Sequence, residues 1–180
     1  SADADLAVGA YSGAVTATVD NANAATLTIG TGATTLNTKG AGTLTVNGDA
    51  GGTAALTIQG GDADTGAVTV ADYESTGTLT LGNSLNAGAV AITTKGTGGR
   101  TIALGTSANV TSRAVTATTL ADGQTLTLTG DKAVTLTSAD ADLAVGAYSG
   151  AVTATVDNAN AATLTIGTGA TTLNTSGAGT

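Results

Sequence analysis

A short alternating phrase recurs at nearly even intervals through the middle of this chain of 180 residues. Each phrase alternates Thr or a small residue with a large aliphatic residue, as in Thr43-Leu44-Thr45-Val46. Alternation with a period of two places the aliphatic side chains on one face of a β-strand. Turn-forming residues such as Asn47-Gly48-Asp49 separate the phrases, so the pattern predicts an all-β fold of short, regularly spaced strands. The first aliphatic residues of successive phrases are Leu44, Leu56, Val68, Leu79, Val90 and Ile102.

The missing aromatic residues narrow the choice among all-β folds. Phe and Trp are absent and Tyr occurs only 3 times, whereas a two-sheet sandwich usually fills its core with large side chains. Small aliphatic residues fill the narrower interior of a β-solenoid, in which stacked coils align like side chains in ladders. We therefore expect a β-solenoid (parallel β-helix) of strand-turn repeats of about 11–12 residues, with no helix and with an aromatic-free interior.

A long literal repeat divides the chain. Residues 1–38 are identical to residues 138–175, so that Ser1 recurs as Ser138 and Tyr11 recurs as Tyr148. Residues 1–137 then form one complete unit and residues 138–180 begin the next, which predicts a fragment of a longer tandem array.

The unit holds a series of candidate strands, whose coils the sequence does not define. Two strands in each coil would give coils of about 22–24 residues, and three would give about 35. The candidates centre on Leu6–Val8, Val15–Val19, Leu27–Ile29, Leu36, Leu44–Val46, Leu56–Ile58, Val68–Val70, Leu79–Leu81, Val90–Ile92, Ile102–Leu104, Val115, Leu126–Leu128 and Val134–Leu136.

The composition excludes several kinds of chemistry. The chain has neither His nor Cys, which removes the Ser-His-Asp triad, the thiol nucleophile and the thiolate zinc site. Carboxylate pairs can cleave sugars, but such sites normally carry aromatic platforms, and Tyr11, Tyr73 and Tyr148 are the only aromatic residues. We expect no enzyme. The net charge of −8 disfavours nucleic acid and anionic membranes as partners, and no apolar run reaches membrane-spanning length.

Three Asp-Ala-Asp triplets are candidate cation sites. Alternate Asp residues in an extended segment point the same way and offer the oxygen ligands that Ca²⁺ prefers. Solvated carboxylates in turns are the other reading, because the complete calcium-binding nonapeptide is absent. The candidate ligands are Asp3, Asp5, Asp62, Asp64, Asp140 and Asp142.

Paired threonines suggest a second kind of surface. Two hydroxyl groups fall on one side of a strand in Thr-x-Thr segments, and flat ladders of such pairs occur on ice-binding β-solenoids. Favourable β-propensity on a half-exposed face explains the same residues without a ligand. The pairs are Thr26/Thr28, Thr43/Thr45, Thr78/Thr80 and Thr125/Thr127, and Ala interrupts the pattern at Ala55, Ala67, Ala89 and Ala103.

The phrase Gly-Thr-Leu-Thr-Leu-Gly at residues 77–82, together with the near-identical repeats, resembles bacterial β-strand-repeat surface proteins. These include S-layer proteins and large adhesins exported by type I secretion, and the β-helical shafts of filamentous-haemagglutinin-type exoproteins are also similar. The resemblance implies a secreted, extracellular, calcium-supported structural protein on a Gram-negative cell surface.

The expected function is a cell-surface rod, filament or layer formed by stacked solenoid repeats. Its expected partner is itself, head to tail, because the end of a stacked array exposes unpaired backbone groups. A surface polysaccharide is a further candidate partner. The alternative function is an adhesin stalk, or a ligand- or ice-binding module that presents a Thr-rich face.

Overall fold

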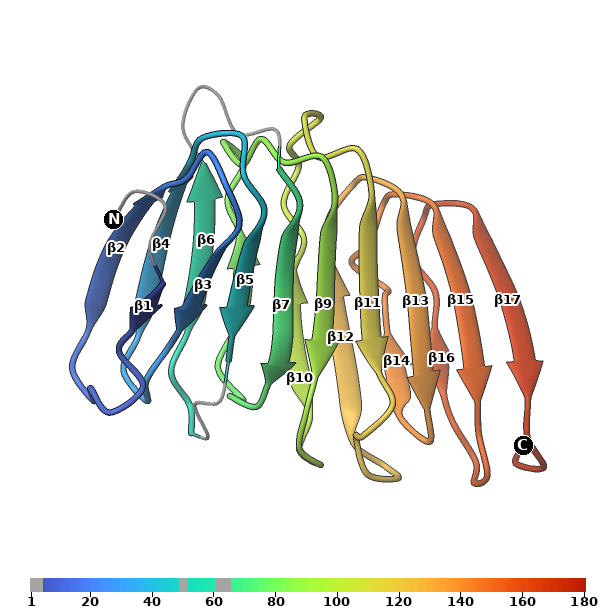
Figure 1. Ribbon diagram of the computed structural model, residues 1–180. Coiled ribbons are helices and arrows are strands. Elements are labelled where there is room, and N and C mark those ends of the chain that lie inside the picture. The colour runs from blue at the N-terminus through green and yellow to red at the C-terminus, as the bar shows by residue number, and fades with distance from the viewer. Residues whose placement is uncertain (1–4, 49–51, 61–65) are drawn as a thin grey trace.

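The computed structural model describes residues 5–48, 52–60 and 66–180, and these residues form an all-β solenoid of about eight coils without any helix (Figure 1). Each coil contributes one strand to each of two parallel sheets. The odd-numbered strands build a nine-stranded sheet and the even-numbered strands an eight-stranded sheet. The strands are β1 (Leu6–Ala7), β2 (Val15–Asp20), β3 (Ala25–Thr28), β4 (Thr34–Lys39), β5 (Leu44–Asn47), β6 (Leu56–Gly60), β7 (Val68–Tyr73), β8 (Leu79–Leu81), β9 (Val90–Thr94), β10 (Arg100–Ala103), β11 (Arg113–Ala117), β12 (Thr125–Thr129), β13 (Val134–Ala139), β14 (Asp142–Ala144), β15 (Val152–Asp157), β16 (Leu164–Thr165) and β17 (Thr171–Ser176).

The structure confirms the fold class and every candidate strand of the unit, and it decides that a coil has two strands. Coil length is not constant. The coil that leads from Leu44 to its partner Val68 is longer than the coil that leads from Val15 to its partner Thr34. The turns absorb this difference, and the inward aliphatic residues stay aligned from coil to coil. The register does shift where β7 pairs with β9, between the pair Val70/Ile92 and the pair Tyr73/Thr94.

Inward aliphatic residues form unbroken rows along the axis. Leu56 and Leu79, whose burial was predicted, are adjacent in the eight-stranded sheet and almost fully removed from solvent. At about 25 cal/mol per Å² of apolar surface, such rows are the main stabilising term of the fold. One row of the nine-stranded sheet runs through Leu27, Val46, Val70, Ile92, Val115, Leu136, Ala154 and Leu173.

The expectation of an aromatic-free interior is wrong. Tyr73 and Tyr148 are among the largest fully buried side chains. The hydroxyl of Tyr73 donates to the carbonyl of Gly77 at 2.9 Å, and the hydroxyl of Tyr148 donates to the carbonyl of Lys132 at 2.6 Å. A buried tyrosine needs a partner for its hydroxyl, and the turns at the coil corners supply carbonyl acceptors that a strand interior lacks.

Glycine is required where successive corners touch. A Cβ added to Gly66 would lie 1.8 Å from the carbonyl oxygen of Gly42, one coil earlier. No side chain fits at that distance, so the corner packs backbone against backbone.

The two copies of the repeat lie on opposite sheets. β2 and β15 have the same sequence, Val-Thr-Ala-Thr-Val-Asp, yet β2 belongs to the eight-stranded sheet and β15 to the nine-stranded sheet. The cause is the odd number of strands in one repeat unit. Strands β1 to β13 make up one unit, and an odd number of strands at two in each coil leaves the next unit half a coil out of phase.

One substitution distinguishes the copies. Lys39 forms an ion pair with Asp20 at 3.3 Å on the neighbouring strand. In the second copy, Ser176 replaces the lysine beside Asp157. Both partners of the ion pair are largely exposed, so it contributes little to stability.

Candidate functional site: the ends and outer faces of the solenoid

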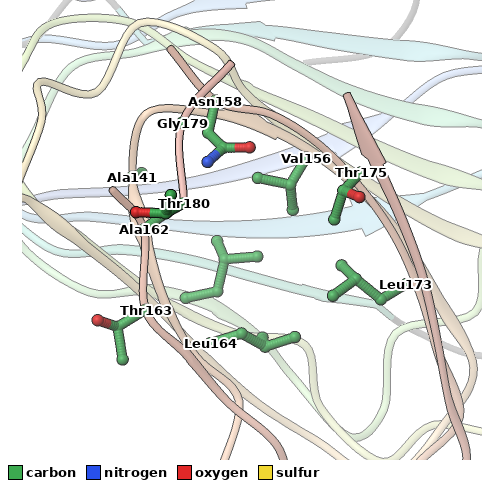
Figure 2. A pocket seen from close by; sticks show the side chains of 11 residues that line it. Ala141, Val156, Asn158, Ala162, Thr163, Leu164, Leu173, Thr175, Gly179 and Thr180 are labelled. Carbon is green, nitrogen blue, oxygen red and sulfur yellow. The ribbon is translucent and has the colours of Figure 1, made fainter. Parts of the chain in front are cut away.

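The C-terminal end of the solenoid is an open apolar hollow, which we call the C-terminal end face (Figure 2). It has a volume of about 240 Å³, and none of its lining side chains is charged. Leu143 and Val156 form its floor from the coil below. Leu164 of β16 and Leu173 of β17 flank it from the two sheets.

The first copy shows the same residues with this face covered. Leu173 is 43% exposed, whereas the identical residue of the first copy, Leu36, is 0% exposed. Leu36 is covered because Ile58 of the following coil pairs with it. The residues of the C-terminal end face are therefore suited to contact with a further coil.

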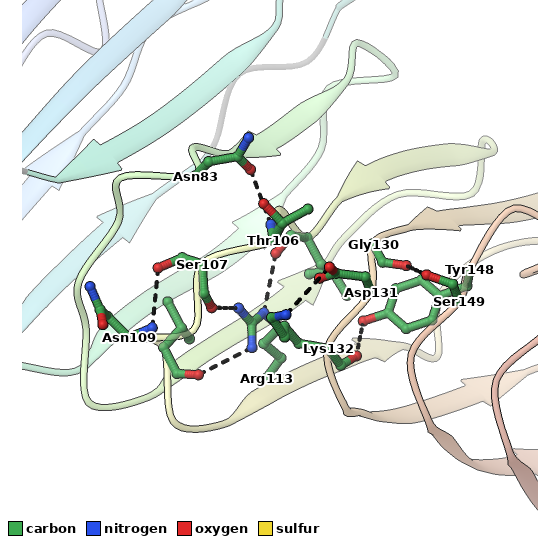
Figure 3. Close-up of polar contacts among 12 residues, drawn as sticks. Asn83, Thr106, Ser107, Asn109, Arg113, Gly130, Asp131, Lys132, Tyr148 and Ser149 are labelled. Atoms are coloured by element: carbon green, nitrogen blue, oxygen red, sulfur yellow. Dashed lines mark hydrogen bonds and ion pairs between the residues drawn. The ribbon is translucent and has the colours of Figure 1, made fainter.

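The N-terminal end mirrors this relationship. Tyr11 is 56% exposed, but its copy Tyr148 is 1% exposed. Tyr148 is covered by the preceding corner, where it bonds to Lys132 and forms an isolated bridge with Gly130 (Figure 3). Leu6, only half-buried, packs against the core at the same end. Tyr11 and Leu6 mark what we call the N-terminal end face.

Threonine rows run along both outer faces. In the eight-stranded sheet, one row of successive partners is Thr16, Thr35, Thr57 and Thr80. The predicted interruption at Ala103 comes next, and Thr129 continues the row. The nine-stranded sheet has the corresponding row Thr135, Thr153 and Thr172. Of the predicted Thr-x-Thr residues, Thr80 lies in the first of these rows, and Thr26 pairs with Thr45 in the nine-stranded sheet. Thr28 instead pairs with Asn47, and Thr125 with Asp142.

The three candidate calcium ligands that the structure describes, Asp5, Asp140 and Asp142, accept hydrogen bonds from the backbone of the next coil. Asp5 accepts the N–H of Thr26 at 2.8 Å, and its copy Asp142 accepts the N–H of Thr163 at 2.7 Å. Asp140 accepts the N–H groups of Ala159 and Asn160. These bonds give the carboxylates a structural role at the corners.

The calcium prediction itself stays open. Within the described parts of the chain, no three acidic or otherwise metal-ligating side chains gather into a group that could hold an ion. Of the predicted ligands, Asp3, Asp62 and Asp64 lie outside the described residues.

Two buried arginines were missed by the sequence analysis. The guanidinium of Arg113 donates to the carbonyls of Leu104 and Val110, both at 3.1 Å, and to the carbonyl of Ser107 (Figure 3). Arg100 in the same way donates to the carbonyls of Lys95, Gly98 and Gly99. Neither arginine belongs to an ion pair among the described residues.

Burial shifts the pKa values of both arginines and of the buried tyrosines Tyr73 and Tyr148. Loss of solvent lowers the pKa of Arg113 and raises the pKa of nearby Tyr148 to about 12. The alternation contained the signal: Arg113 lies two residues before Val115, and Arg100 two before Ile102, so both arginines are on the inward face. Each guanidinium ties a wide turn to the core, a structural use of five fixed donors.

Family models, curated proteins and solved structures offer no match to this chain. The fold alone defines the class, which is a β-solenoid repeat protein. Among the residues described, no helix has the length and apolar character needed to cross a membrane.

Proposed function

We propose that this chain is a structural protein whose solenoid repeats stack head to tail into a rod, filament or layer. The observation that carries the proposal is the pair of end faces. Each presents a large side chain, Leu173 or Tyr11, whose identical residue in the other copy of the sequence is buried under a neighbouring coil. Stacking of one subunit on the next would bury Leu173 and Tyr11 in the way that Leu36 and Tyr148 are buried already.

The backbone supports the same conclusion. The outer edges of β16 and β17 carry N–H and C=O groups that no further strand pairs in this structure. A head-to-tail contact between such edges does not close on itself, so it propagates into a filament.

Electron microscopy of the purified chain tests the proposal. We expect filaments whose width is that of one solenoid, or layers of them. Leu173→Asp should abolish them, because it places a charge in the C-terminal end face while leaving the half-exposed position foldable. Thr155→Asp is the matched control on the outer face of β15, and it should assemble normally. Dispersed particles of the unmodified chain at all concentrations would contradict the proposal.

A secreted, extracellular location belongs to this proposal and is supported by the resemblance to bacterial surface repeat proteins. Calcium support and attachment to a surface polysaccharide belong to it on the same basis. Chelation during assembly separates the calcium component: it should dissolve the filaments if the ion joins subunits, and leave them intact if it does not.

A Thr-rich binding face is the second candidate function, favoured by the aligned row Thr16, Thr35, Thr57 and Thr80. Its readout is thermal hysteresis of ice growth, or retention on glycan. Substitution of Thr57 by Lys should abolish that activity while leaving filaments intact, which distinguishes the two functions.

A further inference from the structure

We propose that a second copy of this chain docks on the C-terminal end face only after a half turn about the solenoid axis. The nine-stranded sheet of one subunit then continues as the eight-stranded sheet of the next. This inference rests on the proposed head-to-tail assembly and specifies its geometry.

The step at each end dictates the rotation. β17 lies on the nine-stranded sheet and follows β16, which lies on the eight-stranded sheet, by half a coil. The lowest vacant strand position is therefore above β16. In the incoming copy β1 comes half a coil before β2, so β1 must take the position above β16 and β2 the position above β17. Without the rotation, β1 would sit above β17 and the position above β16 would stay empty.

The rotated junction brings together side-chain pairs that the chain already contains. Continuation of the rows places Leu6 of the incoming copy beside Leu164, and within one chain Leu6 pairs with Leu27, the copy of Leu164. On the outer face, Thr16 comes beside Thr172. Thr16 pairs within the chain with Thr35, the copy of Thr172. The contacts are thus the observed ones in reversed order.

The C-terminal end face has the chemistry for this occupant. Its lining side chains are uncharged and its flanks are Leu164 and Leu173. Ala17 of the second copy would lie over Leu173, and Ala17 already pairs with Leu36, the copy of that leucine. Junctions of this kind match small against large residues, as the interior of the solenoid does.

The rotation gives the filament two equivalent flanks. Every outward residue appears on one side in one subunit and on the opposite side in the next. The odd number of strands in the repeat unit does the same within the chain, where Thr16 and its copy Thr153 lie on different sheets. Each subunit should advance the filament by about 41 Å, at about 4.8 Å for each coil.

Pairs of cysteines test the rotation directly. Neighbouring strands bring outward residues within disulfide range. The variant Thr16→Cys/Thr172→Cys should form ladders of covalent polymers on mild oxidation, because each disulfide joins two subunits. The two residues of one chain lie at opposite ends and cannot meet. The matched control is Ala7→Cys/Asn174→Cys, which should stay monomeric on a non-reducing gel. Without the rotation β1 would sit above β17, and because Leu6 and Leu173 belong to one row, Ala7 would then come beside Asn174.

The outcomes separate the two proposals. Polymers from the Thr172 variant alone support the half turn. Polymers from the Asn174 variant alone overturn the half turn and leave head-to-tail assembly standing. Filaments that neither variant cross-links overturn the half turn as well, since the strand rows would not be continuous. Absence of both filaments and cross-links overturns the proposed function and this inference with it.

Discussion

Tyr11 and Tyr148 occupy the same position in two identical stretches of sequence, yet Tyr11 is 56% exposed and Tyr148 is 1% exposed. The difference arises from the neighbouring coil alone. The preceding corner at Gly130–Lys132 covers Tyr148 and accepts its hydroxyl hydrogen bond. No described residue lies in the corresponding place on the N-terminal side of Tyr11. The pair therefore measures what one additional coil contributes.

Alkaline pH should destabilise the protein through Tyr148. Burial raises its pKa from 10.0 to about 12, so between these values the unfolded chain loses a proton that the folded chain keeps. The free energy of unfolding is unaffected by this group below pH 10 and falls as the pH rises toward 12. Urea unfolding at a series of pH values measures the slope. Tyr148→Phe should make it shallower. An unchanged slope in this variant would contradict the assignment.

A charge at Leu79 should disrupt the stack locally. Leu79 is fully buried between Leu56 and Ile102, so Leu79→Asp leaves a carboxylate without a partner and should cost more than about 4 kcal/mol. Thr80→Asp, on the outer side of the same strand, should change stability by less than about 0.5 kcal/mol. Thermal unfolding followed by circular dichroism compares them. Equal melting temperatures for the two variants would show that the strand faces are assigned wrongly.

Removal of the Arg113 guanidinium should be costly although it forms no ion pair among the described residues. Arg113→Met leaves three turn carbonyls without their donor, and the expected loss is more than about 3 kcal/mol. Arg113→Lys should recover only part of it, because one ammonium cannot reproduce the fixed fork of donors.

The control for this experiment is Lys39→Met. It removes an exposed ion pair with Asp20 and should cost less than about 1 kcal/mol. The second copy already has Ser176 at this position. Chemical denaturation of the three variants ranks the effects. A loss for Arg113→Met no larger than for Lys39→Met would contradict the role given to the guanidinium.

Asp142 should stabilise the corner through its hydrogen bond to the Thr163 N–H. Asp142→Ala should cost about 1 kcal/mol, and Asp142→Asn less, because the amide oxygen still accepts a hydrogen bond. Chemical denaturation measures both losses, and equal losses for the two variants would argue against the hydrogen bond as their cause.

Calcium binding by the aspartate triplets is a separate prediction. Added Ca²⁺ should raise the unfolding temperature, and Asp62→Asn/Asp64→Asn should reduce the increase. An unchanged unfolding temperature on addition of Ca²⁺ to the unmodified chain would remove calcium from the proposed function, without affecting the structural role of Asp142.

The spacing of aliphatic residues determined the all-β class, every strand of the unit and the inward rows, because a strand has one strict period and only one face of each strand is buried. The same alternation contained the inward positions of Arg100 and Arg113. Sequence reasoning overlooked them because charged residues are rarely buried without a partner, and only the folded turns bring the carbonyls that satisfy these two side chains.

Tertiary structure alone decided the number of strands in a coil and the burial of Tyr73. Both depend on how far the turns spread the two sheets, and the turn residues do not encode that distance locally. It also decided that identical segments lie on opposite sheets. Thirteen strands follow from the sequence, but their odd number has a consequence only once the chain winds with two strands in each coil. Tyr11 and Tyr148 show the same limit, because burial depends on the neighbouring coil and not on the residue itself.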